Sequence, residues 1–527
     1  MRTKGNPFRG LAVPALLFSI SAVLGSQLAR AQIQVARVTV QTEPLGGQIP
    51  KDFAGFSLEV STAGQGIGAF APDGTRIAST SPMAEYALGT PTAPNEAFFQ
   101  FMQNLGSGIL RLGGNSQDNT CWNPAAAPHP DRCKGQLSAG DFQLFSRAAK
   151  ASGWRLIIGL NLKQNSSQWA LDEVTQAIAQ DIKPEQIFGL ELGNEPDLFS
   201  RDGGRPATYT PTDHVRDFLA YRDAFEHNPI ARKYALIGPA TCCAWRNAGS
   251  LDIFLDGVGA SNLKLATVHS YLLTTCGGRK VSMEELLAPA LMTRFRDETQ
   301  SLVTAAHKRQ LQIALAETNS ASCGGMPGVS NAFAAALWGI DSLFSAAEAG
   351  FSAVNFHFSY RPGGSSYNPV DTYERLDNSG RQLYQNIAQP LYYGMYLFAR
   401  SAAGEYFLPA STQTESNIRS YATTACSTCA VNIVIINKDA SASGRVRVHI
   451  ANRAGMATLL LLRAPKLGSF SQEVTYGGAR FSSDGHIPAP HTQQIKSDAQ
   501  GSYDFDLPNS AAAVLAVPGE ESHSQHY

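Results

Sequence analysis

The sequence predicts an α/β protein, a (β/α)8 TIM barrel with an additional all-β sandwich formed mainly by the C-terminal region. Three observations lead to this prediction. From about residue 50 to about residue 403, strand-like and helix-like stretches alternate as in repeated βα units. Eight of these stretches have strand character, the number that closes a parallel barrel. After about residue 404, short β-rich stretches are separated by Gly, Ser, Asn and Pro, which is typical of a β-sandwich.

Residues 1–31 have the features of a secretory signal peptide. Basic residues precede the apolar run LAVPALLFSISAVLGS, and Ala29 to Ala31 give a small-x-small cleavage pattern. A membrane anchor is the alternative, but the run is shorter than the roughly 20 apolar residues of a spanning helix, and it contains Pro14. We therefore expect a secreted or periplasmic protein that keeps no membrane anchor after cleavage.

The expected mature chain is mildly acidic. Residues 1–31 contain four basic and no acidic residues, so their removal changes the formal net charge from −1 to −5. A protein that follows a polyanion needs a basic face. The remaining chain contains no run rich in Lys and Arg, so a nucleic acid partner is not expected.

The predicted barrel strands are short apolar stretches. In chain order they are DFAGFSLEV, GILRLGG, WRLIIGLNL, IFGLELGNE, YALIGPAT, LKLATVHSYL, LQIALAETN and FSAVNFHF. Helical patterns between them include NEAFFQFMQNLG, AGDFQLFSRAAKASG, SSQWALDEVTQAIAQ, TPTDHVRDFLAYRDAFEH, MEELLAPALMTRFRDETQSLVTAAHKRQ and NAFAAALWGIDSLFSAAEAG, which ends at Gly350. A doubly wound open sheet is the competing architecture, but no Gly-rich phosphate turn follows the first strand.

The predicted sandwich consists mainly of GRVRVHIA, ATLLLLRAP, YDFDLP, AAAVLAVPG and their neighbours. The early stretch ARVTVQTE, within residues 32–49, is expected to add a strand to it. The predicted division is therefore an N-terminal segment at 32–49, a barrel at 50–403, a sandwich at 404–518 and a disordered polar tail at 519–527.

Eight cysteines in an exported chain permit disulfides. Cys121 and Cys133 flank a short Pro-rich loop and form the most plausible pair. Cys426 and Cys429 form the motif CSTC, and without a second CxxC or HxxxH we predict a tight structural disulfide there rather than a zinc site. The sequence does not determine how the remaining cysteines pair, namely Cys242, Cys243, Cys276 and Cys323.

Two glutamates stand at the carboxyl ends of predicted barrel strands. Glu195 ends the fourth strand in GLELGNEPDLFS, and Glu317 ends the seventh in ALAETNS. Functional groups of this fold come from the carboxyl ends of the strands, so the two side chains should converge. Alone, each could be a solvated loop residue, and Glu191 in the same strand is expected to be a buried structural group with a partner.

Two facing carboxyl groups are what glycoside hydrolysis needs: an acid that protonates the leaving oxygen and a carboxylate that attacks the anomeric carbon. Their separation, which distinguishes retaining from inverting enzymes, is not contained in the sequence. Other chemistries lack their motifs, since the chain has no GxSxG, no HExxH and no phosphate loop. The two carboxyl groups would perform both steps, so no metal or other cofactor is expected.

Several motifs resemble glycoside hydrolase family 79, a family of β-glucuronidases and heparanases among the retaining (β/α)8 glycosidases. They are GFSLEV, LRLGGNSQD, GLELGNEPDLF, VHSYL, LAETNSASCGGMPGVSNAFAAALWGIDSLFSAAEAG, VNFHF and FDLPNSAAAVLAV. The resemblance covers essentially the whole mature chain, and the segment around Glu317 is its most specific part.

The resemblance implies roles for individual residues. Glu195 would be the acid/base and Glu317 the nucleophile, with Arg111 and Tyr271 as donors that keep Glu317 ionised. Arg111 and Tyr271 are also expected among the substrate-contacting residues. Asn194 would bind the 2-hydroxyl of the sugar.

The remaining ring hydroxyls would meet Glu59 and Asn115 at the ends of the first two strands. Both could instead be polar loop residues that bond to the backbone. His269 and His357 could touch substrate or serve as structural groups, and Trp122 and Trp245 could stack on a sugar or pack in the core. These alternatives stay open at the level of sequence.

Relatives bind the uronic acid carboxylate with tyrosine hydroxyls and with backbone N–H groups of a glycine turn. Gly324 and Gly325 fit this turn. The tyrosines of that pattern are replaced, with Ser322, Cys323 and Phe356 at the corresponding places. Tyr360, with Arg361 and Tyr367 in the same loop, could compensate or could simply shape the loop.

We therefore predict an exported retaining β-glycosidase, in the first place an exo-β-glucuronidase acting on β-linked glucuronides or glucuronic-acid-capped glycans. A heparanase-like endo-β-glucuronidase, a retaining enzyme for another sugar and a non-catalytic carbohydrate-binding protein are the alternatives. The acidic net charge disfavours a long sulfated chain as substrate, and the presence of both glutamates disfavours loss of activity.

Overall fold

The structure, a computed structural model, describes residues 34–43, 47–61, 68–70, 76–78, 87–90, 92–122, 135–201, 203–358, 365–377 and 382–519. The predicted signal peptide, Cys133, Tyr360, Arg361 and all but the first residue of the predicted tail lie outside these ranges. None of the helices within them combines the length and the apolar character that a bilayer crossing requires.

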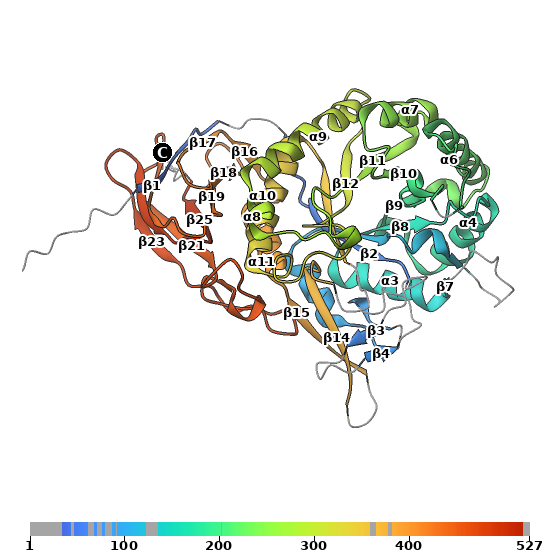
Figure 1. Ribbon diagram of the computed structural model, residues 1–527, viewed down its shortest axis with the longest axis horizontal. Coiled ribbons are helices and arrows are strands. Elements are labelled where there is room, and N and C mark those ends of the chain that lie inside the picture. The colour runs from blue at the N-terminus through green and yellow to red at the C-terminus, as the bar shows by residue number, and fades with distance from the viewer. Residues whose placement is uncertain are drawn as a thin grey trace, which may run out of the picture.

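Eight parallel strands close into a barrel, which confirms the predicted fold class (Figure 1). They are β2 (Ala54–Glu59), β5 (Ile109–Gly113), β8 (Arg155–Leu160), β9 (Ile187–Leu192), β10 (Leu236–Thr241), β11 (Leu263–Ser270), β12 (Ile313–Thr318) and β13 (Ala353–Phe358). The ring closes where β13 pairs with β2, from Val354 opposite Ala54 to Phe358 opposite Leu58. Each strand lies within one of the eight predicted stretches.

The inside of the barrel is apolar where the strands begin and polar where they end. Ile109 and Ala353 belong to a small buried apolar cluster at the strand starts. Arg111 and His357 follow them at spacings of two and four on the same strands and are also buried. Because alternate side chains of a strand share a face, all four point inward. The alternation therefore delivers charged groups to the end of the barrel where such folds place their sites.

Helices cover the outside of the barrel (Figure 1). They are α2 (Glu96–Asn104), α3 (Ala139–Ser152), α4 (Ser167–Glu173), α5 (Ala179–Asp181), α6 (Pro211–Glu226), α7 (Ala248–Val258), α8 (Met283–Leu287), α9 (Pro289–His307), α10 (Phe333–Ala349) and α11 (Pro390–Ser401). The stretch predicted as one helix from residue 283 to 310 is two helices, because Pro289 has no backbone N–H with which to continue α8. A π-helical turn, Val174–Ile178, separates α4 from α5.

Two sheets form the predicted sandwich. One has the order β17 (Ala410–Gln413), β1 (Gln34–Val40), β20 (Gly444–Ile450) and β24 (Ser502–Leu507). The other has the order β16 (Tyr406–Leu408), β18 (Ile418–Thr424), β19 (Val431–Asn437), β25 (Ala511–Val517), β21 (Met456–Arg463) and β22 (Thr475–Tyr476), with β23 (Gln493–Lys496) paired to β21. The N-terminal strand β1 runs antiparallel to β17 and parallel to β20.

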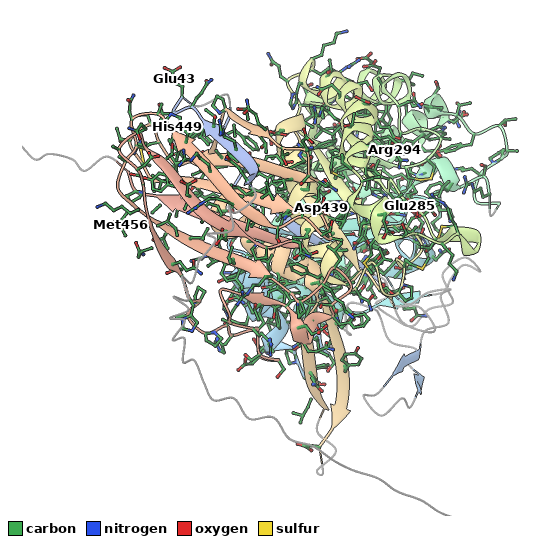
Figure 2. The ribbon with its side chains drawn as sticks, turned by 60° about the vertical axis from the view of Figure 1, so that its left-hand side comes forward. Glu43, Glu285, Arg294, Asp439, His449 and Met456 are labelled. Atoms are coloured by element: carbon green, nitrogen blue, oxygen red, sulfur yellow. A yellow bond between two sulfur atoms is a disulfide. The ribbon has the colours of Figure 1, made fainter. Side chains whose placement is uncertain are left out.

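Short strand pairs decorate the barrel: β3 (Gly68–Phe70) with β4 (Arg76–Ala78), β6 (Thr120–Trp122) with β7 (Gly135–Leu137), and β14 (Val370–Leu376) with β15 (Gln382–Ala388). The β14–β15 hairpin extends from the barrel at the bottom of Figure 1. Figure 2 shows polar side chains on both parts of the molecule, such as Glu285 and Arg294 on the barrel and Glu43 and His449 on the sandwich.

A buried ionic cluster joins the sandwich to the barrel through α10, which lies between them in Figure 1. Asp341 of α10 accepts hydrogen bonds from the Tyr421 hydroxyl and the Lys438 ammonium, each at 2.5 Å. The side chains of Asp341 and Lys438 are each 2% exposed. The Tyr421 ring also stacks on Phe344, with centroids 4.4 Å apart. The sandwich thus anchors the helix that follows β12.

We expect Asp341→Asn to lower the free energy of unfolding by about 3–5 kcal/mol, because it leaves the Lys438 ammonium buried without a counter-charge. Urea unfolding followed by circular dichroism would measure the loss. The double variant Asp341→Leu with Lys438→Met removes both buried charges and should lose less, because the other cation near Asp341, Arg419 at 3.3 Å, is partly exposed and also faces Glu348. A double variant as unstable as the single one would contradict this account.

Candidate active site

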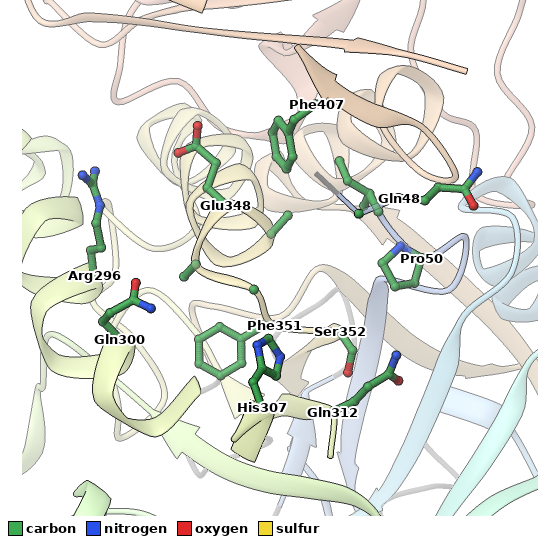
Figure 3. Close-up of a pocket in the computed structure, with 15 residues that line it drawn as sticks. Gln48, Pro50, Arg296, Gln300, His307, Gln312, Glu348, Phe351, Ser352 and Phe407 are labelled. Carbon is green, nitrogen blue, oxygen red and sulfur yellow. The ribbon is translucent and has the colours of Figure 1, made fainter. Parts of the chain in front are cut away.

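Two cavities lie at opposite ends of the barrel strands. One, of about 740 Å³, adjoins Gln312 and Ser352, which precede β12 and β13, and also reaches Phe407 of the sandwich (Figure 3). The other, of about 440 Å³, lies at the carboxyl ends of the strands and collects Glu195 and Glu317. In barrels of this kind the second position carries the functional groups, so we take it as the candidate site.

The backbone presents each glutamate differently. Glu317 lies near the end of β12, where the register of this strand shifts against both β11 and β13. Glu195 follows β9 in a tight turn with φ 51° and ψ 56°, the left-handed region that costs energy for a residue with a Cβ. Its N–H donates to the carbonyl of Ala240 at 2.9 Å. The preceding N–H, of Asn194, donates to the carboxylate of Asp118, in the turn that follows β5, at 2.6 Å, so the Glu195 turn is held by β10 on one side and by the turn after β5 on the other.

The structure brings the two carboxyl groups close together. An oxygen of Glu195, an oxygen of Glu317 and a ring nitrogen of His269 all lie within 4.8 Å of one another. His269 Nδ1 is 3.0 Å from Glu195 Oε1 and 3.9 Å from Glu317 Oε2. A retaining glycosidase holds its carboxyl groups about 5–5.5 Å apart and an inverting one about 6.5–9.5 Å apart. The limit of 4.8 Å between one oxygen of each group lies well below the inverting range and next to the retaining one.

Arg111 holds the ionic network behind the cavity. Its Nε donates to Glu191 at 2.6 Å, its Nη1 to Glu317 at 2.9 Å, and its Nη2 to the Asn194 side chain at 2.7 Å. The Arg111 side chain is 0% exposed. The structure therefore corrects its predicted place among substrate-contacting residues: Arg111 acts on Glu317 from behind, as the predicted donor to that carboxylate. Glu191 is the buried, partnered group that the sequence suggested.

The two carboxyl groups have opposite pKa shifts. Burial alone would raise the pKa of Glu317, but positive charge on His357, His269 and Arg111 outweighs burial and lowers that pKa to about 2. The Tyr271 hydroxyl contributes by donating to Glu317 Oε1 at 2.9 Å.

The pKa of Glu195 is raised well above its usual value. Burial is the main cause, followed by the negative charges of Glu317 and Asp197. Over the pH range between the two shifted values, Glu195 is protonated and Glu317 is ionised, which is how environment divides the roles of two carboxyl groups.

The pKa values of the two histidines are shifted in opposite directions. Burial lowers the pKa of His269 to about 4, so the ring beside Glu195 is neutral at pH 7. Burial opposes protonation of His357 too, but the carboxylates of Glu317 and Glu59 raise its pKa above the usual value. The neighbouring carboxylates therefore favour the protonated form of His357 and burial favours the neutral form of His269, and both histidines line the cavity.

Glu59 and Asn115, which the sequence suggested as contacts for ring hydroxyls, both line the cavity. The Glu59 carboxylate accepts from the backbone N–H groups of Asn115 and Ser116, at 3.1 and 2.7 Å, and from the Ser116 hydroxyl at 2.6 Å. A Cβ at Gly114 would meet this carboxylate at 2.5 Å, in a residue with φ of 74°. The glycine is thus required for the turn that holds Glu59.

The turn after β12 has three successive left-handed residues, Cys323, Gly324 and Gly325, with φ of 65°, 86° and 77°. Ser322 and Cys323 face the cavity. Gly324 accepts from the backbone N–H of Ser366 at 2.8 Å, which ties the turn to the segment after β13. The structure thus places the two predicted glycines in a turn beside the site, with Ser322 and Cys323 nearer to the cavity.

Some lining residues were not singled out by the sequence. Arg201 and Arg246 belong to the loops after β9 and β10. The cavity lining also includes Leu198, Thr274, Cys242, Cys243 and Cys276. Tyr367, which the sequence did offer as a compensating or loop-shaping residue, lines the cavity too and packs edge-on against His357, with centroids 6.3 Å apart. The residues that the sequence did not predict lie on long loops. Because tertiary contacts determine the paths of such loops, no periodic pattern in the sequence predicts which loop residues reach the cavity.

The two tryptophans considered for stacking have other partners. Trp122 is 6% exposed and packs against Phe142, with centroids 5.6 Å apart. Trp245 lies 5.6 Å from the Tyr209 ring. Core packing, the alternative at the level of sequence, is what the structure shows for Trp122.

Disulfides frame the cavity. Cys242 is bonded to its neighbour Cys243, and Cys276 to Cys323, which joins the loops after β11 and β12. Away from the cavity, in the sandwich, the predicted Cys426–Cys429 disulfide is confirmed. Cys121, in β6, is disulfide-bonded as well.

Two groups of side chains in the described ranges have the spacing of metal ligands. Glu195, His269 and Glu317 form one, and Asp197, Cys242 and Cys243 form the other. A thiolate, not a disulfide sulfur, binds metal, so the disulfide leaves the second group with a single carboxylate. In the first group, Arg111 already supplies a cation to Glu317.

The fold and the paired carboxyl groups are those of a glycosidase. A 4-O-α-L-rhamnosyl-β-D-glucuronidase from Fusarium oxysporum aligns with a TM-score of 0.71 and 17% identity, over 91% of this chain and 100% of that one. A family 51 arabinofuranosidase from Xanthomonas axonopodis aligns with a TM-score of 0.64 and 14% identity, over 92% and 99%. The chain therefore has the barrel-and-sandwich fold found in these glycosidases.

Sequence relatives narrow the resemblance. The chain is 27% identical over 345 residues to a β-glucuronidase of Neurospora crassa, and 25% over 353 residues to one of Aspergillus niger. These alignments cover 58% and 59% of this chain and 61% and 63% of the relatives. A heparanase of Gallus gallus is 28% identical over 227 residues, 42% of each chain. No family model matches, but the resemblance to glycoside hydrolase family 79 is confirmed by these relatives.

We expect Arg111→Met to lower the free energy of unfolding at pH 7 by about 3–5 kcal/mol, because Glu191 and Glu317 lose their buried counter-charge. The loss should shrink toward pH 4.5. An unpaired buried carboxyl has a raised pKa, so it takes up a proton in the folded protein as the pH falls. Denaturant unfolding at both pH values measures the effect.

The matched control is Arg147→Met, whose partner is the exposed Glu96, with both side chains 56% exposed. It should change stability by at most about 1 kcal/mol at either pH. An Arg111 variant no less stable than this control, or one whose loss grows toward acid pH, would refute the role assigned to the guanidinium.

Proposed function

We propose that this protein is a retaining β-glycosidase that hydrolyses β-linked glucuronides by double displacement. The observation that carries the proposal is a pair of carboxyl groups within 4.8 Å of each other whose pKa values are shifted in opposite directions. The β-glucuronidases of N. crassa and A. niger support the choice of sugar. The three disulfides with both partners in the described ranges also fit a secreted or periplasmic location.

In the first step, Glu195 gives its proton to the leaving oxygen while Glu317 attacks the anomeric carbon. The bond to the leaving group breaks and a glycosyl ester forms on Glu317. In the second step the ionised Glu195 takes a proton from water, which attacks the anomeric carbon and releases the Glu317 carboxylate. Arg111 and Tyr271 occupy different oxygens of Glu317 and so fix the carboxylate in one orientation.

The remaining site residues would orient the sugar. Asn194 accepts from Arg111 through its oxygen, which leaves its amide N–H groups free to donate to the 2-hydroxyl. Glu59 and Asn115 face the cavity at the ends of β2 and β5 and would contact other hydroxyls. The turn at Gly324 and Gly325, with Tyr367, would face the uronic acid carboxylate.

An endo-acting, heparanase-like enzyme is the second candidate, favoured by the similarity to the Gallus gallus heparanase. Arg201 and Arg246 at the cavity would suit an acidic polymer. Products of a defined glucuronic-acid-containing oligosaccharide distinguish the two, because an exo enzyme releases only the terminal sugar.

Glu317→Gln and Glu195→Gln are expected to lose activity in different ways. Removal of the nucleophile should abolish release of 4-nitrophenol from its β-glucuronide. Removal of the acid should cost about 10²–10⁴-fold on an alkyl glucuronide, whose leaving group needs protonation, and much less on the nitrophenyl substrate. The exposed Glu185→Gln is the control. Full activity of Glu317→Gln would sink the mechanism, and a wild type inactive on every glucuronide would sink the assigned sugar.

The pH profile of kcat/KM should rise through the lowered pKa of Glu317 and fall through the raised pKa of Glu195, because the active form has the first ionised and the second protonated. Asp197→Asn removes one negative charge that raises the pKa of Glu195. Its profile should therefore lose activity at a lower pH on the alkaline side. The control Asp256→Asn, on the outer helix α7, should leave the profile in place. An alkaline limb that stays, or moves to higher pH, would contradict the assignment.

A further inference from the structure

The candidate cavity has a small apolar wall. Most of its lining side chains are ionisable or carry hydroxyl or amide groups. The aliphatic and sulfur groups among them are Leu198, the Cys242–Cys243 disulfide and the Cys276–Cys323 disulfide. In a site that must read the hydroxyls of a sugar, such groups indicate a part of the substrate that has none.

Leu198 and the Cys242–Cys243 disulfide belong to the same hydrogen-bonded unit as Glu195. The Leu198 N–H donates to the Glu195 carbonyl at 2.8 Å. The Cys242 N–H donates to the carboxylate of Asp197 at 3.2 Å. Glu195 itself donates its N–H to Ala240, two residues before Cys242. Leu198 and this disulfide are therefore fixed in position relative to the carboxyl group that we assign as proton donor.

The Cys276–Cys323 disulfide lies near the nucleophile rather than near the proton donor. Cys276 and Cys323 lie on the loops after β11 and β12, the strands that lead to Tyr271 and Glu317. The proton donor acts on the leaving oxygen, and the nucleophile acts on the anomeric carbon. A group fixed to the proton donor therefore lies toward the leaving group rather than toward the sugar that forms the ester.

A disulfide between adjacent cysteines is a compact ring with little freedom to lose when a ligand binds. Its sulfurs are polarisable and make favourable contacts with aromatic rings. Cys242 is 6% exposed, which anchors the ring in the protein, while Cys243 is exposed. Arg201 and Arg246 line the same cavity, and a guanidinium attracts the face of an aromatic ring.

We propose that Leu198 and the Cys242–Cys243 disulfide form a leaving-group subsite that takes a flat aromatic aglycone, so that glucuronides of phenols are preferred substrates. The inference deepens the proposed function and rests on it. The subsite contacts the leaving group and not the glucuronic acid. Removal of the subsite should therefore change kcat/KM by different factors for glucuronides that differ only in the leaving group.

The test compares kcat/KM of the wild type and of the double variant Cys242→Ala, Cys243→Ala on 4-nitrophenyl and methyl β-glucuronide. We expect the nitrophenyl substrate to lose about tenfold, equal to about 1.4 kcal/mol, and the methyl substrate to change less than twofold. The control is Cys426→Ala, Cys429→Ala, which removes a disulfide of the sandwich. Leu198→Ala keeps the disulfide and should shift selectivity in the same direction, so the test does not depend on folding of the double variant.

Two results would overturn the subsite. An equal or larger loss on the methyl substrate would mean that the wall only positions Glu195, because a poor leaving group depends most on the acid. A β-glucuronosyl disaccharide that loses as much as the nitrophenyl substrate would assign the wall to a sugar face instead. A wild type inactive on all three substrates would refute the proposed function itself, a different outcome from unchanged selectivity in the variants.

Discussion

The charge of Arg111 is the constraint on which the polar end of the barrel depends. Glu191 and Glu317 are both buried there, and a buried carboxylate costs several kcal/mol unless it is paired and hydrogen-bonded. Arg111 pairs with both and uses its remaining donors on Ser57 and Asn194. Glu195 has no direct contact of this kind in the described network and has the raised pKa. Arg111, with His357 and His269, lowers the pKa of Glu317, while burial and neighbouring carboxylates raise the pKa of Glu195, and this difference divides the acid from the nucleophile.

Contacts around β12 hold Glu317 in its position relative to Glu195. The Asn319 side chain, two residues after Glu317, donates to the carbonyls of His357 and Tyr367 at 2.8 and 3.0 Å. The Cys276–Cys323 disulfide then ties the turn to the neighbouring loop, and α10 leads to the buried Asp341 contacts with the sandwich. The sandwich therefore stabilises the strand end that carries the nucleophile, although it lies outside the cavity.

Sequence reasoning located the barrel strands and both glutamates because the strands are apolar, short and regularly spaced, and because strand ends converge in this fold. It failed where loops decide. The Cys242–Cys243 and Cys276–Cys323 pairs lie on loops whose paths depend on tertiary contacts, which no local period encodes. The division at Pro289 does have a local signal, the missing N–H of proline, which the prediction of one long helix did not use. Arg111 was placed against substrate, yet its spacing of two from Ile109 inside a barrel strand already indicated a buried group with buried partners.

Trapping of the ester intermediate tests the central claim most directly. A 2-deoxy-2-fluoro-β-glucuronide with a good leaving group slows both steps, and the second more, so a glycosyl ester should accumulate. Mass spectrometry of the intact protein and of its peptides would then locate the added sugar. The account predicts one adduct, on Glu317, that is absent from Glu317→Gln. Turnover of the ordinary substrate without any adduct, or an adduct on another residue, would contradict it.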